Sequence, residues 1–534
     1  MKLPVSFTRI RGALKDRELI GSQPPSLHLI YSAEFEFAAL GLRKILAKEY
    51  VVRSEKRRPH GYSFIAFKVL QGSSFFQHSL KKQSLREEEQ LYLSDLRRFF
   101  QSLPINSIRH KLKGISHVYI GLEPEMNFSN QSAAIVLNNV AFQDCLMFPR
   151  NILNVIIEKQ PSTSLKIFRF HEGNYTEVAL EYSFPTISNY LQQKYFINLV
   201  SIRLFEIYFR DQTFTSEFIY PVTLKRSIGF IDVIEYLLGK TLSKLWSGAK
   251  VELVWSVAVL DLSLSANPNQ ELRIIPNPEG RSLADPFVID FNNNNYIFVE
   301  DVNLSTSKGS ISVIDLSEGI DSYKILKCLD EEFHMSYPFV FQYEGAWYMC
   351  PETSRANQIV LYKCVQFPNS WEFSKVLMRN ISAVDVNIFE HDSVWNMTFS
   401  YSPMGKRGRN SEMHWFTASS PISNVWTHMG EKPLVTHSQL SRNGGISSNS
   451  SKQYAIRQNH GFENYGMGIN LVELQLDENG FKHIIRAKIS VTSHHEVLQS
   501  HHYSSSCALV AVDIQSPLGK TIQQDPLKLN MSIN

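Results

Sequence analysis

The chain has 534 residues, 43% hydrophobic and 20% charged, which is typical of a globular protein long enough for two or more cores. Its 54 basic and 51 acidic residues nearly balance, so the charge gives no support for a nucleic-acid partner. Five cysteines without C-x-x-C spacing argue against a structural zinc site and a disulfide framework. We therefore predict neither a metal nor a cofactor.

Basic residues cluster at 53–60 and 405–410, and we interpret both clusters as solvated loops. No stretch reaches the ~20 apolar residues that a membrane-spanning helix requires. The closest, residues 227–246, contains Asp232 and Lys240 and is typical of an amphipathic helix. The first residues lack the apolar run of a secretory signal. We expect a cytoplasmic protein without a transmembrane segment.

Residues 1–245 are predicted to form an α/β domain, because strand-like and helix-like patterns alternate along them. The predicted strands lie at 26–32, 114–122 and 132–142, and the predicted helices at 33–50 and 85–103. No glycine-rich loop follows the first strand, so the dinucleotide-binding fingerprint has no support.

Residues 250–515 contain an internal repeat. The stretch ADPFVIDFNNNNYIFVED begins at residue 284, and SYPFVFQYEGAWYMCPET begins at 336. Asp285 aligns with Tyr337 and Glu300 aligns with Glu352, with a spacing of fifteen residues in both copies.

Three further copies follow. The third, at 384–401, has Asp385 and Ser400 at the two positions, and the fourth, at 441–459, has Arg442 and Arg457. A fifth copy, at 500–515, has His501 or His502 at the first position.

Two more β-rich runs follow each of the first four hairpins, and turn-forming residues bound them. Four strands per unit, at steps of 52, 48 and 57 residues, are typical of propeller blades. We therefore predict a five-bladed β-propeller over 250–515, with the run at 250–262 as the outer strand that closes the ring. A β-sandwich would leave the constant spacing unexplained. Residues 516–534 are expected to form a C-terminal tail.

The innermost strand of each blade lines the central channel of a propeller, so residues at one repeat position converge on one mouth. We predict that the first position supplies a ring of polar side chains there, with the second position beside it. The alternative is that these residues tie neighbouring blades together, because buried polar groups are costly unless paired.

The repeat region resembles a known family. The segments RSLADPFVIDFNNNNYIFVED, HMSYPFVFQYEGAWYMCPET, VDVNIF, SRNGG and IRQNHGFENYGMGI occur in this order. They resemble the N-terminal propeller domain of plant glucosamine inositolphosphorylceramide transferases, which also occurs in bacterial proteins of polysaccharide gene clusters. In the plant enzymes the transferase domain proper follows the propeller, and this sequence has no room for it after residue 515. Direct sugar transfer therefore stays open.

The bacterial members of this family carry a formyltransferase-like domain before the propeller. Residues 168–191 are similar to its later part, and His171 lies near the expected position of its histidine. The His-Pro-Ser-Leu-Leu-Pro motif is missing. The resemblance implies a degenerate formyltransferase-like domain within 1–245.

The ADPF motif is more distantly similar to five-bladed glycosidases of the arabinanase and xylosidase kind. Those use an aspartate base, a second aspartate and a glutamate acid in successive blades. Asp285 matches the base, whereas the next two positions hold Tyr337 and Asp385. Glycosidases need two carboxylates in different protonation states, and Asp285 with Asp385 or Glu352 meets this need.

Three functions follow. The first is a glycan or glycolipid biosynthesis protein, associated with glycan-synthesis enzymes, whose propeller mouth binds a sugar or sugar-phosphate. Its binding residues would be Glu300, Tyr337, Arg442, Arg457, Gln458, His460 and His501. The second is a glycoside hydrolase in which Asp285, Asp385 and Glu352 are catalytic. The third is a non-catalytic scaffold that binds another protein.

Overall fold

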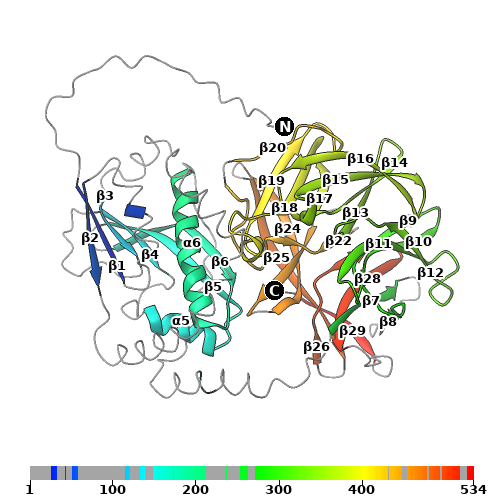
Figure 1. The fold of residues 1–534 in the computed structure, drawn as a ribbon, viewed down its shortest axis with the longest axis horizontal. Helices are drawn as coiled ribbons and strands as arrows, with labels where there is room; N and C mark the ends of the chain where they lie inside the picture. Colours follow the sequence, from blue (N-terminus) through cyan, green and yellow to red (C-terminus); the bar gives the residue numbers. More distant parts are fainter. Residues whose placement is uncertain are drawn as a thin grey trace, which may run out of the picture.

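The computed structural model describes fifteen stretches and two single helical positions of the chain. These are 26–32, 42–43, 51–57, 115–120, 133–138, 148–171, 174–210, 236, 238, 253–262, 271–430, 432–447, 454–462, 464–477, 480–493, 496–517 and 526–533. Within these ranges the chain is mostly β structure, and a mixed sheet with two long helices lies beside a propeller (Figure 1). None of the helices in the described ranges combines the length and apolarity needed to cross a membrane.

A six-stranded sheet with strand order β2-β1-β3-β4-β5-β6 forms the N-terminal module. Its first four strands are parallel, and β5 and β6 continue it antiparallel. The strands are β1 (Ser26–Ser32), β2 (Val51–Arg57), β3 (Ile115–Ile120), β4 (Ala133–Asn138), β5 (Ser162–His171) and β6 (Asn174–Pro185). The strands predicted at 26–32, 114–122 and 132–142 are therefore present.

Two helices, α5 (Phe148–Ile157) and α6 (Tyr190–Arg210), also belong to this module (Figure 1). The helices predicted at 33–50, 85–103 and 227–246 lie almost entirely outside the described residues. The α/β class of residues 1–245, its formyltransferase-like character and the domain bounds consequently stay predictions.

The first three propeller units are four-stranded antiparallel sheets in simple chain order. The first contains β9 (Arg281–Phe291), β10 (Asn294–Asn303), β11 (Lys308–Asp315) and β12 (Lys324–Leu329). The second contains β13 (Ser336–Tyr343), β14 (Ala346–Glu352), β15 (Gln358–Gln366) and β16 (Ser370–Arg379), with the short helix η3 (Ser354–Ala356) before β15. The third contains β17 (Val384–His391), β18 (Val394–Ser400), β19 (Met413–Ala418) and β20 (Thr427–His428).

The innermost hairpin has the same two-residue turn in all three units. The turn residues are Asn292–Asn293, Glu344–Gly345 and Asp392–Ser393, and all six have positive φ between 48° and 75°. Two consecutive left-handed residues define the type I′ turn, whose twist matches that of the flanking strands. The repeated hairpin predicted from the sequence is thus built by one turn geometry.

The fourth and fifth units share one eleven-stranded sheet. The fourth contains β21 (Arg442–Asn443), β23 (Tyr454–Gly461), β24 (Asn464–Asp477) and β25 (Gly480–Ser493). The fifth combines β27 (Tyr503–Ser505) and β28 (Leu509–Pro517) with β7 (Leu253–Asp261) and β8 (Glu271–Ile275). The ring is therefore closed by strands from opposite ends of the region, and β8, rather than the run at 250–262, is the outermost of these four.

Short strands connect these last two units. The strand β22 (Gly445–Ser447) pairs in parallel with β27, and β26 (Glu496–Leu498) pairs with β25. Part of the predicted tail, β29 (Leu527–Ile533), lies between β25 and β8 and joins the two units into one sheet.

Apolar side chains fill the space between neighbouring units. Phe287, Phe298 and Phe339 belong to a buried cluster that spans the first three units. Trp347 packs against Phe367 with ring centroids 5.3 Å apart, inside the same cluster. This core fixes the inner strands, whose ends carry the candidate site.

Candidate functional site

The same β-bulge recurs in the innermost hairpin of the first three units. Between β9 and β10, Phe287 pairs with Phe298 and Ala284 pairs with Glu300, so two residues oppose one. The hairpins β13–β14 and β17–β18 show the same shift of register. A bulge bends a strand and redirects a side chain, and bulges are frequent beside active sites.

Each bulge contains a residue in the left-handed conformation. The φ angles of Asp285, Tyr337 and Asp385 are 51°, 47° and 53°. This conformation is uncommon for residues other than glycine and persists only where the surrounding structure enforces it. The same conformation recurs at the first repeat position of three units, so the predicted repeat is also a repeat of backbone conformation. In each unit the end of the inner strand is held in a conformation that costs energy.

The fourth unit departs from this pattern. Arg442 pairs with Gln458, and Asn443 pairs with Arg457, without a bulge. By this pairing Arg442 corresponds to Ala284, and Gln458 to Glu300. The two repeat positions of the fourth unit are therefore Asn443 and Gln458, and the sequence alignment, which placed Arg442 and Arg457 there, is wrong by one residue.

Side chains from all five units enclose one cavity of about 440 Å³. It lies at one mouth of the propeller, where the bulged strand ends meet. Its lining residues are Trp255, Asp285, Glu300, His334, Ser336, Glu352, Val384, Asp385, Lys406, Arg409, Asn410, Arg442, Tyr465 and His501. We call this the axial cavity. Six of the predicted site residues line it, namely Asp285, Glu300, Glu352, Asp385, Arg442 and His501.

Asp285 is held between three units. Its Oδ2 accepts the backbone N–H of Tyr337 at 3.0 Å, and its Oδ1 lies 3.1 Å from Nε2 of His501. Burial acts to raise the pKa of Asp285, but hydrogen bonds and positive charge from His501 and His502 outweigh it and leave the pKa well below its usual range. Asp285 is consequently an ionised carboxylate.

A second buried carboxylate lies behind His501. Nδ1 of His501 is 3.0 Å from Asp513, which is fully buried and accepts the backbone N–H groups of His501 and His502 at 2.9 Å each. Burial acts to lower the pKa of His501, but Asp513 and Asp285 raise it to about 10. Ligand atoms of the three side chains lie within 4.8 Å of one another, as in a metal site. Because both ring nitrogens face carboxylates, an imidazolium between two anions explains the cluster better than a metal.

The other carboxylates of the axial cavity are easier to protonate. Burial raises the pKa of Asp385 to about 6, although Arg442 opposes this, and Glu352 and Asp285 add to it. Burial also raises the pKa of Glu352, against the opposing charge of Arg442. Burial likewise raises the pKa of Glu300, although His334, which forms an ion pair with it at 3.0 Å, opposes this. The cavity thus combines one ionised carboxylate with three of raised pKa.

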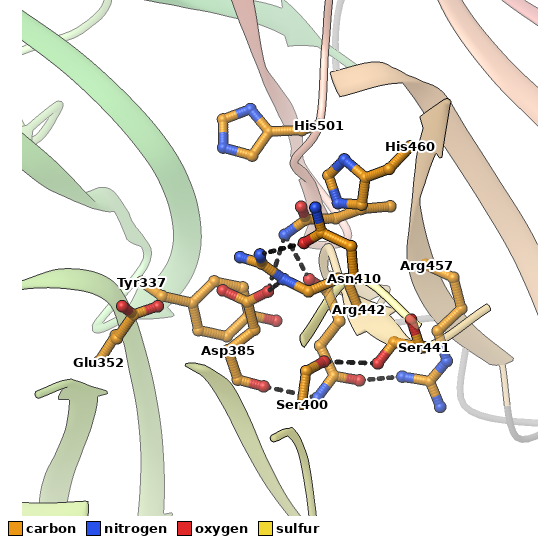
Figure 2. A network of polar contacts seen from close by, with 12 residues as sticks. Tyr337, Glu352, Asp385, Ser400, Asn410, Ser441, Arg442, Arg457, His460 and His501 are labelled. Carbon is orange, nitrogen blue, oxygen red and sulfur yellow. Dashed lines mark hydrogen bonds and ion pairs between the residues drawn. The ribbon is translucent and has the colours of Figure 1, made fainter. Parts of the chain in front are cut away.

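Cationic side chains face these acids from the fourth unit and from the β18–β19 connection. Arg442 pairs with Asp385, donates to Asn410 at 3.0 Å, and lies 5.6 Å from the ring centroid of Tyr465 (Figure 2). Lys406 and Arg409 belong to the short helix α8 (Lys406–Arg409). The basic cluster at 405–410, interpreted from the sequence as a solvated loop, therefore contributes to the cavity.

Four predicted site residues lie outside the axial cavity. Tyr337 is fully buried, and its hydroxyl donates to Asn387 at 2.8 Å and accepts the N–H of Gly445 at 3.1 Å. Arg457 is 2% exposed, contacts Asn443, and lies away from the Arg442–Asp385 pair in Figure 2. Burial lowers its pKa to about 10.

Gln458 is also fully buried, and it donates to Asp385 at 3.1 Å and to the carbonyl of Asn443 at 2.6 Å. His460 accepts the N–H of Gly466 at 3.4 Å and stacks on Tyr465. Gln458 thus ties the fourth unit to the third, as the alternative interpretation of the repeat expects, whereas these contacts of His460 lie within the fourth unit.

An aromatic wall of the axial cavity was not predicted from the sequence. The ring of Trp255 lies 4.4 Å from that of His501 and 6.4 Å from that of Tyr465, measured between centroids. Tyr465 is 41% exposed. Neither residue occupies a repeat position, so only the motif NYGMGI and the Trp within a closing strand signalled them.

Residues 276–504 match the family model described as Glucosamine inositolphosphorylceramide transferase 1, N-terminal. The predicted resemblance is confirmed over this range. Proteins named glucosamine inositolphosphorylceramide transferase 1 from Arabidopsis thaliana and from Oryza sativa subsp. japonica are both 31% identical to this chain, over 199 and 166 residues. These matches cover 36% and 30% of this chain but only 26% and 22% of the relatives, so the chain spans about a quarter of their length.

Similar solved structures include a thermostable family-43 glycoside hydrolase, with 15% identity and a TM-score of 0.32, covering 41% of this chain and 83% of that one. The catalytic domain of the Coprinopsis cinerea GH62 alpha-L-arabinofuranosidase has 10% identity and a TM-score of 0.32, covering 50% and 98%. Identities and TM-scores this low give no indication of function.

Proposed function

We propose that the axial cavity binds a sugar that carries an anionic group, a phosphate or a carboxylate, as a step in glycan or glycolipid biosynthesis. The main support for the proposal is that carboxyl groups from three units lie in one cavity with cationic side chains from the fourth unit and α8. Its volume of about 440 Å³ lies within the range of roughly 300–1,000 Å³ that is typical of small-molecule sites.

Each side of the cavity suits a different part of such a ligand. The carboxyl groups of Glu300 and Glu352 suit sugar hydroxyls, because carboxylates accept strong hydrogen bonds. Lys406 and Arg409 suit the anionic group. The rings of Trp255 and Tyr465 suit the apolar face of a sugar, as aromatic walls do in many small-molecule sites.

The relatives' name describes a glucosamine inositolphosphorylceramide transferase, which supports a ligand from glycolipid synthesis. Because this chain spans about a quarter of those relatives, we propose ligand binding by this region and not the whole transfer reaction.

Binding is tested by isothermal titration with glucose 1-phosphate, glucuronic acid and glucose. We expect the two anionic sugars to bind at least about tenfold more tightly than glucose, since a charged contact adds 1.5–3 kcal/mol in rough terms. Lys406→Met should remove most of this difference, because Lys406 lines the cavity and is exposed. Lys363→Met, on the exposed side of β15, is the matched control and should leave it unchanged. Equal binding of all three sugars would contradict the proposal.

Glycoside hydrolysis is the second candidate, and one observation favours it. Asp285 is ionised, while burial raises the pKa of Asp385 and Glu352, which is the asymmetry that an acid–base pair requires. Against it, both oxygens of Asp285 already accept contacts from Tyr337 and His501. A panel of 4-nitrophenyl glycosides decides the point. Hydrolysis that Asp285→Asn abolishes would favour this candidate, and absence of nitrophenol release across the panel would exclude it.

A further inference from the structure

A second cavity, of about 260 Å³, lies where the N-terminal module meets the propeller. Pro185, Ile187 and Phe196 line it from the N-terminal side, and Asn410, His460 and Tyr465 line it from the propeller side. We call it the junction cavity. Asn410 and Tyr465 also line the axial cavity, so the two cavities share a wall. Figure 2 shows Asn410 and His460 beside Arg442 at this boundary.

The two modules are held together by buried polar contacts. Arg203 of α6 pairs with Glu412 at 2.8 Å, and the hydroxyl of Tyr182 in β6 donates to Glu412 at 2.9 Å. Glu412 is fully buried, and although burial acts to raise its pKa, Arg203 and His414 lower it to about 2. A buried ion pair that loses one partner is strongly destabilising, so this contact fixes the junction.

Backbone hydrogen bonds add to this fixation. The N–H of Ser183 donates to the carbonyl of Thr436 at 2.8 Å, and the N–H of Phe462 donates to the carbonyl of Pro161 at 2.8 Å. At the rim, Arg407 donates to Gln192 of α6 at 3.1 Å. The junction cavity therefore has walls set by specific contacts on both sides.

The chemistry of the junction cavity differs from that of the axial cavity. Ile187 and Phe196 are apolar, and Phe196 packs edge-on against Phe184 with centroids 5.1 Å apart. The rings of His460 and Tyr465 stack at 4.9 Å. Burial, together with the charges of Arg442 and His501, keeps the pKa of His460 well below its ordinary value, so this imidazole is neutral. Thr186, Asn410 and the half-buried Arg407 complete the lining, so the cavity offers aromatic and aliphatic surface beside a few polar groups.

We propose that the junction cavity binds the apolar aglycone of the sugar ligand, so that both modules form one bipartite site. This inference rests on the proposed function, because the sugar itself would occupy the axial cavity. The aglycone would extend from the sugar past Asn410 and Tyr465, which face both cavities. An apolar cavity of about 150 Å³ accommodates benzene. The junction cavity, at about 260 Å³, is therefore large enough for a single aromatic ring or a short alkyl chain against its aromatic and aliphatic side.

The experiment compares methyl, phenyl and hexyl β-D-glucuronide by isothermal titration with the full chain. We expect the phenyl or hexyl compound to bind about tenfold more tightly than the methyl compound, because its aglycone leaves water. Phenyl and hexyl probes distinguish an aryl aglycone from an alkyl one, and tighter binding of either supports the inference.

Two variants locate the effect. Ile187→Ala should reduce the phenyl-to-methyl and hexyl-to-methyl affinity ratios toward one while leaving methyl glucuronide binding unchanged. Ile202→Ala, on α6, removes the same buried volume without lining the cavity and should keep the ratios. Ile187→Phe, whose larger side chain fills the cavity, should also lower both affinity ratios. Thermal unfolding checks that each variant is folded.

The outcomes separate the two proposals. Equal binding of all three glucuronides overturns the bipartite site and leaves the sugar site standing. A preference for the apolar aglycone that survives both Ile187 substitutions places the aglycone elsewhere and also overturns the inference. Binding of none of the three overturns the inference together with the proposed function on which it rests.

Discussion

The first three propeller units and the fourth unit use the same strand end in different ways. The first three place a bulge there, with Asp285, Tyr337 and Asp385 in the left-handed conformation. The fourth has no bulge and supplies Arg442 in direct register with Gln458. The repeated units therefore build an acidic half of the mouth, and the irregular unit supplies the arginine opposite it. A site in a repeat protein can arise where the repeat breaks.

The largest expected effect concerns the contact between these two halves. Arg442→Ala should lower the free energy of unfolding by about 3–5 kcal/mol, because it leaves Asp385 buried without its cation. Adding Asp385→Asn should recover part of this loss, which guanidinium titration of both variants measures. If the double variant is no more stable than Arg442→Ala alone, the two halves are not coupled as described.

A somewhat smaller effect tests the closure of the ring through His501. Its pKa in the folded chain is about 10, above the ordinary 6.5, so its contribution to stability is fully present below pH 6.5 and is lost as the pH rises toward 10. We expect a loss of roughly 4 kcal/mol across that interval. Urea unfolding at several pH values measures it.

His501→Gln should flatten this pH dependence, because glutamine does not titrate. Lys363→Met, far from the cluster on β15, serves as the control and should keep the wild-type profile. A wild-type profile that stays level between pH 6.5 and 10 would show that His501 is not protonated between its two carboxylates.

The smallest effect tests the turn that the first three units share. Ser393 has a φ of 62° in the hairpin turn, where glycine is the favoured residue. Ser393→Gly should stabilise the chain by about 0.5–1 kcal/mol, since a side chain in the left-handed region is costly. Ser370→Gly, in the exposed start of β16, should instead destabilise it by a similar amount. Equal signs for the two substitutions would argue against a type I′ turn at Ser393.

Periodic features of the propeller could be predicted from the sequence. The fifteen-residue spacing and the turn residues gave the hairpins, because turn geometry and strand alternation depend on local residues. The spacing also predicted that residues at the repeat positions lie together, and one cavity is indeed lined by Asp285, Glu300, Glu352 and Asp385. Features that depend on residues close together in the chain, such as these hairpins, could therefore be predicted.

Features that depend on tertiary packing could not be predicted. Arg457 is buried, because the strand pairing of the fourth unit places Gln458, and not Arg457, at the position of Glu300. Tyr337 occupies the first repeat position, yet its hydroxyl is hydrogen-bonded to Asn387 and Gly445 and does not line the axial cavity. Trp255 and Tyr465 have no counterparts in other copies, so no repeat argument reaches them. The junction cavity depends on contacts between residues more than two hundred positions apart.

The most direct test of the central claim is a crystal structure of the chain with glucose 1-phosphate. The account predicts the sugar ring in the axial cavity beside Glu300 and Glu352, with the phosphate within ion-pair distance of Lys406 or Arg409. Density for the ligand on an outer face of the propeller, with the axial cavity filled only by water, would contradict the claim.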